Sequence, residues 1–419
     1  MTATFNEGVV SCLVGMGVLF CPVLNEAAPP KFERSLDTCV LSSFATHDPS
    51  VIRPLAAKSD PSNLFTTVRD SKGEIRPVYR VDGHVHSSDH SGNRSSLTDI
   101  RRTAERRKLD ALFLTDHMGI KKWPEINARQ LDRGPSPRIF LGVEAGSANG
   151  HLGLWGANSK WTGKRIRSFR DLIQYYAKTQ PQALRILNHP GWWPVGGRHY
   201  RRRNFSDTTS RPKLQAVEIF NGRSLLRFST LRIVKRWETF LLSGLKVPLV
   251  AGSDAHSFED VATVMTAVAA RGLTPAGIID GVKGGKTYVT DDASLAFYAS
   301  EHSIGETIRV ASNQTGLPVR VFVSSRRGGR LSLFLGKRII AQQEISSGCH
   351  GFETIATLST LKADSYLRIQ LVRKERKPAY YSSILKEQVP SALQDYIGMM
   401  SSPIFLDLEP YDDHWESIP

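Results

Sequence analysis

Short apolar runs alternate with amphipathic segments through the middle of the chain, from Tyr79 to about residue 290. Runs of this length between turn residues predict buried strands, and the segments between them have helical spacing. The predicted strands are Arg80–Val85, Ala111–Thr115, Ile139–Val143, Leu152–Trp155, Leu184–Leu187, Ala216–Phe220 and Val247–Ala251, and the predicted helices are Leu97–Lys108, Phe169–Lys178, Ser224–Leu242 and Thr274–Val282. Strands that alternate with helices favour an α/β fold built on a repeating βα sheet or barrel.

The pattern changes on both sides of this region. Beyond about residue 290, short strands without helices between them are predicted at Leu317–Val323, Arg330–Phe334, Ile355–Leu358 and Tyr366–Leu371, which favours a small β-sandwich-like domain. Residues 31–78 are rich in Pro, Ser, Asp and Lys, as is typical of a linker or an N-terminal extension. We therefore divide the chain into 1–30, 31–78, 79–290 and 291–419.

Residues 1–30 contain a nearly continuous apolar run, Val9–Leu24. The run is too short for a comfortable membrane span, so we expect no stable span, and its length suits the core of a signal peptide. Glu7 precedes it and no Lys or Arg does, which is atypical of a signal peptide. A periplasmic or extracellular location is the expectation, and a cytoplasmic one stays open.

The chain carries a formal net charge of +15, with Lys and Arg gathered in short runs. A basic surface attracts anions, so anionic small molecules, nucleic acid and acidic membrane surfaces all suit it. No zinc-finger spacing, basic zipper or RNP-type aromatic pattern accompanies the charge, so nucleic acid is possible but not favoured. The four cysteines form no CxxC pair and suggest no disulfide framework, which leaves metal chemistry to His and carboxylates.

Histidines and carboxylates gather at the ends of the predicted strands. His84 and His86 stand at i and i+2 on the first strand, so both imidazoles face one side and can reach one ion. Asp82 is placed to orient one of their ring nitrogens. In βα-repeating folds the strand ends meet at one edge, so the later groups are expected to join the same site. Those groups are Thr115-Asp116-His117, Gly142-Val143-Glu144 followed by His151, Asn188-His189-Pro190-Gly191, and Gly252-Ser253-Asp254-Ala255-His256.

Imidazole and carboxylate together suit Zn, Mn or Fe. The supply of ligands exceeds the four that one tetrahedral ion needs, so we predict two or three divalent ions. Spare ligands and open positions favour a catalytic centre over a structural one. A non-catalytic binding module that contains metal stays open as an alternative.

The ordered series DGHVHS, TDH, GVE, NHPG and GSDAH resembles the PHP (polymerase and histidinol phosphatase) superfamily of metal-dependent phosphoesterases over roughly residues 79 to 290. The resemblance implies a distorted (β/α)7 barrel with two or three ions at the C-terminal face of its strands. Ser402-Pro403-Ile404-Phe405 resembles the closing strand of a β-domain in a branch that includes carbamate and aryl-ester hydrolases. By resemblance the ligands are His84, His86, His117, Glu144, His189, Asp254 and His256, with His151 as a further match.

The sequence departs from the family pattern at one ligand. Many members carry Ser-Asp-Gly a few residues after the HxH pair, and its Asp binds a metal. Ser91 occupies that position here, and either Asp89 or His90 is the candidate replacement. We include His90 among the predicted ligands, and the completeness of a third metal position stays open.

These ligands predict hydrolysis by a metal-bound hydroxide, because a divalent ion lowers the pKa of water towards neutrality. Asp254 is expected to bridge ions or accept a proton, and His151 to protonate the leaving group. The loop after His189 carries Trp192 and Arg198, which suit stacking on a ring and charge-assisted contact with an anionic substrate. A phosphoester is the predicted substrate, and a carboxyl ester or carbamate is the alternative that the C-terminal β-domain favours.

Overall fold

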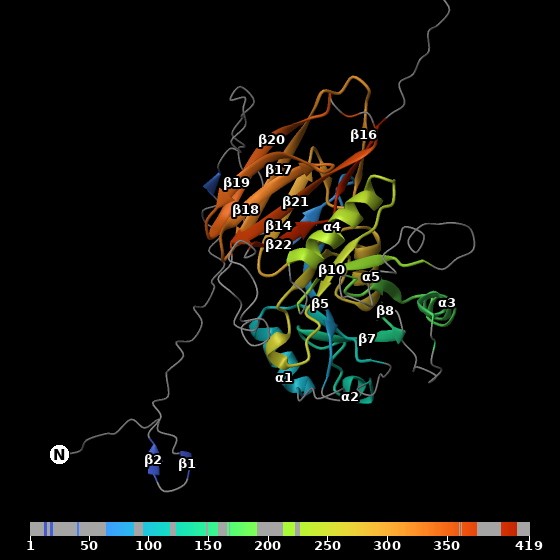
Figure 1. Ribbon diagram of the computed structural model, residues 1–419, viewed down its shortest axis with the longest axis vertical. Helices are drawn as coiled ribbons and strands as arrows, with labels where there is room; N and C mark the ends of the chain where they lie inside the picture. The colour runs from blue at the N-terminus through green and yellow to red at the C-terminus, as the bar shows by residue number, and fades with distance from the viewer. Residues whose placement is uncertain are drawn as a thin grey trace, which may run out of the picture. The chain divides into compact units, whose positions relative to one another are not determined.

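The computed structural model shows the chain as two compact units, Met1–Thr38 and Cys39–Pro419 (Figure 1). The first unit contributes the antiparallel strands β1 (Cys12–Val14) and β2 (Gly17–Leu19) to the described residues. The second contributes strand β3 (Val40–Leu41) and residues 64–87, 95–117, 123–147, 150–157, 166, 168–190, 213–222, 227–359, 361, 363–374 and 395–408.

A 16-stranded mixed sheet organises the second unit. Its first part has the order β11-β10-β9-β8-β7-β6-β5-β12-β13, in which β4 also pairs with β5. These strands are β4 (Thr67–Arg69), β5 (Ile75–Val85), β6 (Ala111–Leu114), β7 (Arg138–Ser147), β8 (Gly150–Trp155), β9 (Leu184–Leu187), β10 (Ala216–Asn221), β11 (Leu249–Gly252), β12 (Met265–Ala269) and β13 (Thr287–Thr290). Each of the seven predicted strands has a counterpart here, so the apolar runs located them well.

The strands of this part of the sheet run in both directions. β5, β6 and β7 are parallel, and so are β9, β10 and β11, but β8 pairs antiparallel with both β7 and β9. The reason is the length of the connection, since Ser147 ends β7 and Gly150 begins β8. A parallel return needs a crossover of about a dozen residues, whereas two residues suffice for a hairpin.

Few helices cover this sheet, and their capping explains where three of them begin. The helices are α1 (Leu97–Arg106), α2 (Trp123–Ala128), α3 (Phe169–Thr179), α4 (Arg227–Leu241) and α5 (Pro275–Lys283), with a 3₁₀ turn, η4, at Phe258–Asp260. Ser96, Ser168 and Thr274 cap α1, α3 and α5 by accepting a hydrogen bond from the backbone N–H three residues on. None of the described helices is both long and apolar enough to cross a membrane.

The closed (β/α)7 barrel is not what the described residues form. β11 and β5 form no hydrogen-bonded ladder with each other there, and a single bridge joins Val85 of β5 to Ala255, which follows β11. The centre between the strands is filled by aromatic side chains, with the Trp155 ring stacked on Phe113 at 4.7 Å. The Trp155 indole also donates to the carbonyl oxygen of Gly83 at 2.8 Å. The fold is therefore mixed α/β with an open sheet.

Six of the strands beyond residue 290 extend the same sheet. β13 pairs with β22 (Asp395–Ser401), and the order continues through β21 (Ser365–Lys374), β18 (Gly329–Leu335) and β19 (Arg338–Ile345). β16 (Thr307–Val310) and β23 (Ile404–Leu408) join beside β21. The boundary at about residue 290 stays a prediction, and the hydrogen-bonded sheet runs across it.

A second sheet of five strands has the order β15-β14-β17-β20-β3. Its remaining members are β14 (Ser294–Ala299), β15 (His302–Ser303), β17 (Gly316–Ser325) and β20 (Gly348–Thr357). Phe297, Val321 and Phe352 from this sheet share one buried core with Leu333 and Ile369 of the main sheet. A β-sandwich in the strict sense stays a prediction.

Two features lie where the sequence suggested little structure. β3, β4 and the start of β5 fall within 31–78, the stretch expected to be a linker or an N-terminal extension. Cys349, at the start of β20, is disulfide-bonded, although the cysteines suggested no disulfide framework. The pairing of β3 with β20 at His350 and Gly351 ties the N-terminal part of the second unit into its five-stranded sheet.

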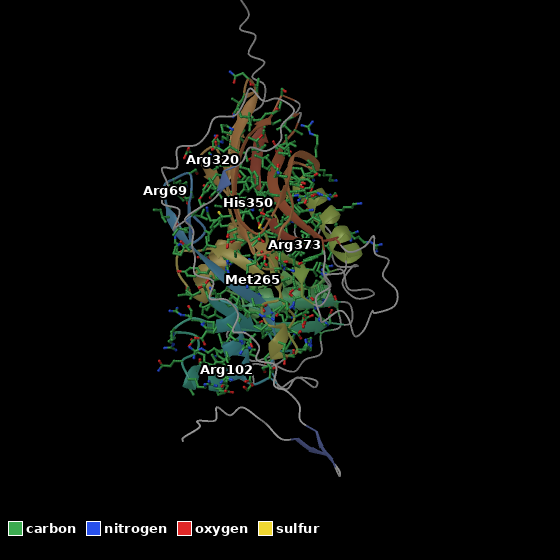
Figure 2. The ribbon with its side chains drawn as sticks, turned by 90° about the vertical axis from the view of Figure 1, so that its left-hand side faces the viewer. Arg69, Arg102, Met265, Arg320, His350 and Arg373 are labelled. Atoms are coloured by element: carbon green, nitrogen blue, oxygen red, sulfur yellow. The ribbon has the colours of Figure 1, made fainter. Side chains whose placement is uncertain are left out.

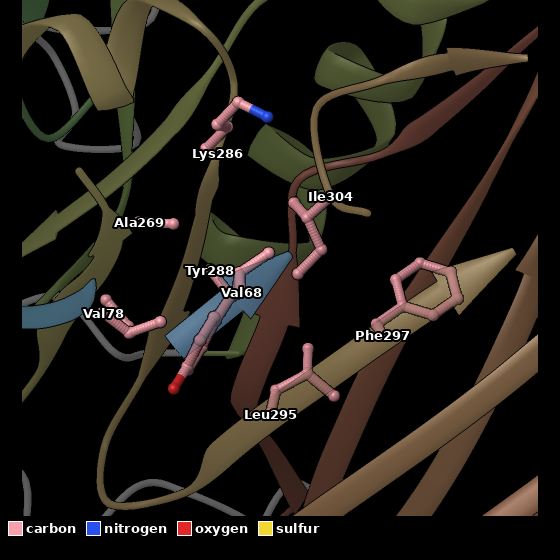
Figure 3. Close-up of a pocket in the computed structure, with 9 residues that line it drawn as sticks. Val68, Val78, Ala269, Lys286, Tyr288, Leu295, Phe297 and Ile304 are labelled. Carbon is pink, nitrogen blue, oxygen red and sulfur yellow. The ribbon is translucent and has the colours of Figure 1, made fainter. Parts of the chain in front are cut away.

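A small apolar pocket lies among β4, β5, β12, β13 and β14 (Figure 3). Its lining is Val68, Val78, Ala267, Ala269, Lys286, Tyr288, Leu295, Phe297 and Ile304. The Lys286 ammonium is 3.8 Å from Asp70 Oδ2. None of the predicted site residues lines this pocket, so it is separate from the centre described next.

Candidate metal centre

Seven strands deliver polar side chains to one edge of the main sheet. β5, β6, β7, β9, β10 and β11 run in one direction and β8 runs against its neighbours, so their C-terminal ends lie beside the start of β8. The predicted ligands that the structure describes meet there: His84, His86, His117, Glu144, His151, His189, Asp254 and His256. His90, Trp192 and Arg198 lie outside the described residues.

Four of these side chains surround one point. Nε2 of His84 lies 3.2 Å from Nε2 of His86, 3.3 Å from Oε2 of Glu144 and 3.5 Å from Oδ1 of Asp254. Nε2 of His86 lies 3.5 Å from the same Glu144 oxygen and 3.3 Å from the same Asp254 oxygen. Ligands at about 2.0–2.1 Å from a tetrahedral ion stand about 3.3 Å apart, so the five distances fit the edges of one coordination tetrahedron.

The tautomer of His84 shows why this point suits a cation. Nδ1 of His84 lies 3.0 Å from Oε1 of Glu218, and an ionised carboxylate only accepts, so Nδ1 carries the proton. The lone pair of Nε2 then faces the oxygens of Glu144 and Asp254, and only a cation or an added proton stabilises that arrangement. Burial alone would lower the pKa of His84, but the charges of Glu144 and Asp254 raise it well above its usual 6.5 in the ion-free protein.

The two carboxylates show the reciprocal effect. Burial would raise the pKa of Glu144, but His84, His151 and His189 together hold it well below its usual 4.5. Burial would also raise the pKa of Asp254, and His84 again outweighs it, so the pKa lies below its usual 3.8. Both carboxylates are therefore ionised near neutral pH, as metal ligands must be.

Glu144 presents its two oxygens to different sets of imidazoles. Oε2 belongs to the tetrahedral position and also lies 3.3 Å from Nε2 of His117. Oε1 lies 3.0 Å from Nδ1 of His151 and 2.8 Å from Nε2 of His189. The hairpin between β7 and β8 explains the position of His151. Because β8 is antiparallel to β7, the start of β8 lies beside the end of β7, and His151 pairs with Gly146 there. A carboxylate shared in this way suits two ion positions.

A third group consists of His86, His117 and His256. The ring of His86 lies 4.4 Å from that of His256 and 4.9 Å from that of His117, measured between ring centroids. The His117 and His256 side chains are 23% and 25% exposed, so solvent reaches this side of the cluster. The group contains imidazoles alone, and a third ion stays a prediction.

The residue that orients His84 differs from the expected one. Asp82 accepts hydrogen bonds from the backbone N–H groups of His84, Ser253 and Ala262 and from the Ser253 hydroxyl. It therefore ties β5 to the segments that follow β11. The imidazole of His84 is held instead by Glu218 of β10.

Sequence reasoning missed Glu218 and Asn221, which contribute no motif of their own. Glu218 lies in Ala-Val-Glu-Ile-Phe-Asn, a strand in which every residue is buried. An ionisable side chain in a fully buried strand needs polar partners, and this was the signal that could have found it. Asn188 was seen only as part of NHPG, and its amide donates to Oε1 of Glu144 at 3.0 Å.

Glycines let the strands approach closely enough for the ligands to meet. A Cβ at Gly252 would stand 2.3 Å from Cβ of His84 and 2.7 Å from its backbone nitrogen. A Cβ at Gly83 would stand 1.9 Å from the Trp155 ring. Any side chain at these positions forces the neighbouring strand or ring to move.

Comparison with known proteins adds one sequence match and several distant folds. Residues 241–287, which include Asp254 and His256, match the PHP-associated family. No curated protein matches the chain.

Several solved structures are similar to the chain. A two-domain protein from Bacteroides vulgatus with a predicted PHP-like metal-dependent phosphoesterase is 15% identical, with 71% of this chain and 91% of that one covered and a TM-score of 0.40. PsfC from Pseudomonas syringae is 19% identical, with 49% and 87% covered and a TM-score of 0.37. The lesion-specific endonuclease PfuEndoQ from Pyrococcus furiosus is 14% identical, with 49% and 56% covered and a TM-score of 0.36. TM-scores of 0.40 and below are too low to assign an activity to this chain.

Proposed function

We propose that this protein is a metal-dependent hydrolase whose substrate is a phosphoester. The observation that carries the proposal is Glu144, whose two oxygens face separate sets of imidazoles within one buried cluster. Two ion positions that share a carboxylate suit hydrolysis of a phosphoester, because one can serve the attacking oxygen and the other the leaving oxygen. The match of residues 241–287 to the PHP-associated family supports the same class.

Divalent ions bound by these residues would supply Lewis-acid activation of water and of the scissile bond. The protein's own groups position and move protons around them. Asp254 lies close to two imidazoles of the cluster, and it is the proposed acceptor for the proton of the attacking water. His151 has a side chain that is 30% exposed, so it can reach a leaving group at the mouth of the site. Arg198 and Trp192 remain proposed substrate contacts.

The second candidate is a carboxyl-ester or carbamate hydrolase on the same centre, as the likeness of Ser402–Phe405 to the closing strand of that branch suggests. A metal-containing binding module is the third. A binding module would bind an ion without hydrolysing any substrate, because a structural ion is usually saturated by four protein ligands.

A substrate panel separates these functions. The ion-free protein is reconstituted with Zn²⁺ or Mn²⁺ and offered an aryl phosphate, a diaryl phosphate, an aryl acetate and an aryl carbamate. We expect the phosphoesters to be hydrolysed fastest and the rate to vanish with a chelator. Fastest turnover of the acetate or carbamate would favour the second candidate, and bound ions without turnover would favour the third.

Variants link the activity to the cluster. His84→Ala should lose both ions and turnover, because Nε2 of His84 lies within 3.5 Å of the other three ligand atoms of the tetrahedral position. His350→Ala, on β20 and outside the cluster, is the matched control and should keep both. Full metal content and full activity in His84→Ala would exclude the proposed centre.

We also propose that the protein is exported to the periplasm or outside the cell. The disulfide at Cys349 supports this, because such bonds persist in oxidising compartments. N-terminal sequencing of the protein isolated from its native cells tests the proposal, and an intact Met1 on protein from the cytoplasmic fraction would contradict it.

A further inference from the structure

We infer that Glu218 is a positioning residue that organises the metal centre from a strand that contributes no ligand. The inference rests on the proposed metal dependence and concerns how the ligands are held rather than what is hydrolysed. β10 lies between β9 and β11, which carry His189 and Asp254 at their ends. Glu218 is 2% exposed and belongs to none of the groups that could hold an ion.

The two carboxylate oxygens of Glu218 act on two different ligands. Oε1 accepts the hydrogen bond from Nδ1 of His84 at 3.0 Å, which leaves Nε2 of that ring free to bind an ion. Oε2 accepts from the backbone N–H of His189 at 2.7 Å and from the Asn221 amide at 3.1 Å. Asn221 in turn lies 3.3 Å from Oδ2 of Asp254. One side chain therefore reaches His84 and His189 directly and Asp254 through Asn221.

These contacts coincide with unusual backbone at two of the ligands. His189 has φ 26° and Asp254 has φ 53°, values in the left-handed region that non-glycine residues rarely adopt. Such conformations persist only where the surroundings hold them, and here the Glu218–Asn221 pair supplies polar contacts to both. The pair thus holds the turns that aim His189 and Asp254 at the site.

The same contacts distinguish Glu218 from a ligand. Both of its oxygens accept hydrogen bonds from protein donors, whereas Glu144 and Asp254 have oxygens that face imidazole Nε2 atoms of the cluster. Carboxylates that orient a metal-bound histidine typically change metal affinity about 10–100-fold when they are removed. We expect an effect of that size from Glu218.

The test compares Glu218→Gln, Glu218→Ala and Glu218→Asp with a matched buried carboxylate. Gln keeps an acceptor for His84 but places an amide where Oε2 accepts from His189. Glu238→Gln is the control, because Glu238 is buried and paired with Arg368 of β21, away from the cluster. The measurements are Zn²⁺ affinity and stoichiometry by competition with a chelating dye, and the thermal unfolding of ion-free protein. The His84 tautomer is read from ¹H–¹⁵N spectra of histidine-labelled ion-free protein, recorded at a pH high enough that the ring is neutral.

We expect Zn²⁺ affinity to fall about 10-fold in Glu218→Gln and about 100-fold in Glu218→Ala, with partial recovery in Glu218→Asp. The His84 spectrum should change from the single Nδ1–H form to a tautomer mixture in Glu218→Ala. Glu238→Gln should lower the unfolding temperature without changing either readout. Zn²⁺ affinity within 2-fold of wild type in Glu218→Ala, or an unchanged His84 tautomer, would overturn the inference. If wild-type protein binds Zn²⁺ but hydrolyses no substrate of the panel, the proposed activity fails while the Glu218 measurements still decide this inference.

Discussion

Two buried clusters of charged residues occupy the main sheet, and they are built on opposite principles. The first is the His and carboxylate centre at the ends of β5 to β11. The second lies in and around β13, β17, β21 and β22, where Arg373, labelled in Figure 2, is 1% exposed. Its guanidinium donates to Asp291, Asp292, the Ser325 hydroxyl and the carbonyl oxygen of Arg327. Arg327 and Tyr396 also donate to Asp291.

The two clusters differ in how hydrogen-bond donors and acceptors face each other. In the arginine cluster, every described contact pairs a donor with an acceptor, so the charges are neutralised by the protein itself. In the histidine cluster, Nε2 of His84 and oxygens of Glu144 and Asp254 converge as acceptors, and the neutralising charge must be supplied from outside. Acceptors that face acceptors in a buried cluster therefore identify a cation site, and paired donors and acceptors identify a structural one.

The largest expected effect comes from removing the carboxylate that the two ion positions share. Glu144→Ala should lose at least one ion per chain and reduce turnover by at least about 10³-fold, since Lewis-acid activation supplies several kcal/mol. Metal analysis and steady-state kinetics on the reconstituted protein measure both. Glu301→Gln changes a carboxylate with an 84% exposed side chain and should alter neither. A Glu144→Ala protein that binds two ions and has wild-type turnover would contradict the proposal that Glu144 is a ligand of both ions.

The next largest effect is expected in the other cluster, on stability alone. Arg373→Met leaves Asp291 and Asp292 buried without their main partner, which should cost about 3–5 kcal/mol of unfolding free energy. Denaturant titration of the ion-free protein measures it, and the metal content of the folded variant should stay unchanged.

A control on a neighbouring strand calibrates that value. Arg330 of β18 pairs with Glu344 across an exposed face, with side chains 40% and 59% exposed. Arg330→Gln should therefore cost no more than about 1 kcal/mol. Similar losses in Arg373→Met and Arg330→Gln would show that burial does not set the energetics of the arginine cluster.

Much of the histidine cluster was predictable because each ligand follows or ends an apolar strand. The runs that end at Val85, Leu114 and Leu187 located His84, His117 and His189, and strand ends on one edge predicted their meeting. The antiparallel course of β8 was also predictable, because the connection after Ser147 is too short for a crossover that would return a parallel strand.

The arginine cluster and Glu218 were not predictable in the same way. Asp291 and Arg373 are 82 positions apart, and only the pairing of β13 with β22 and β22 with β21 brings them together. Such long-range pairing carries no local periodicity, and basic runs usually indicate solvated faces. The sequence also did not reveal that the sheet stays open. Whether it closes depends on how the segment after β11 meets β5, and the residues of either strand alone do not determine this.

The close packing of β5 against β11 gives a test in which one substitution should affect both stability and Zn²⁺ affinity. Gly252→Ala places a Cβ 2.3 Å from Cβ of His84, which forces the strands apart and should cost about 1–3 kcal/mol. His84 moves with its strand, so Zn²⁺ affinity should fall as well. Gly272→Ala, where an added Cβ meets nothing within 4 Å, should leave both unchanged. Unfolding titrations and Zn²⁺ competition report the two effects, and equal behaviour of the two variants would show that close packing at Gly252 is not required.

The last test concerns the pH dependence of the stabilisation by metal. In ion-free protein the pKa values of His84 and His189 are raised above 6.5, so their stabilisation is complete below pH 6.5 and is lost as pH rises through the raised values. The lowered pKa values of Glu144 and Asp254 give stabilisation that is present above pH 4.5 and is lost as pH falls. The ion-free protein should therefore unfold at its highest temperature between about pH 4.5 and 6.5.

Bound ions take the place of those imidazole protons, so the stabilisation by Zn²⁺ should grow as the pH rises towards the raised pKa values of His84 and His189. Each proton displaced adds about 1.4 kcal/mol per pH unit until the raised pKa is passed. Thermal unfolding with and without Zn²⁺ from pH 5 to pH 9 measures the difference, and Arg373→Met should show the same slope because the arginine cluster binds no ion. A stabilisation by Zn²⁺ that stays constant across this range would mean that the ion displaces no proton. The acceptors of His84, Glu144 and Asp254 would then not share a proton when the ion is absent.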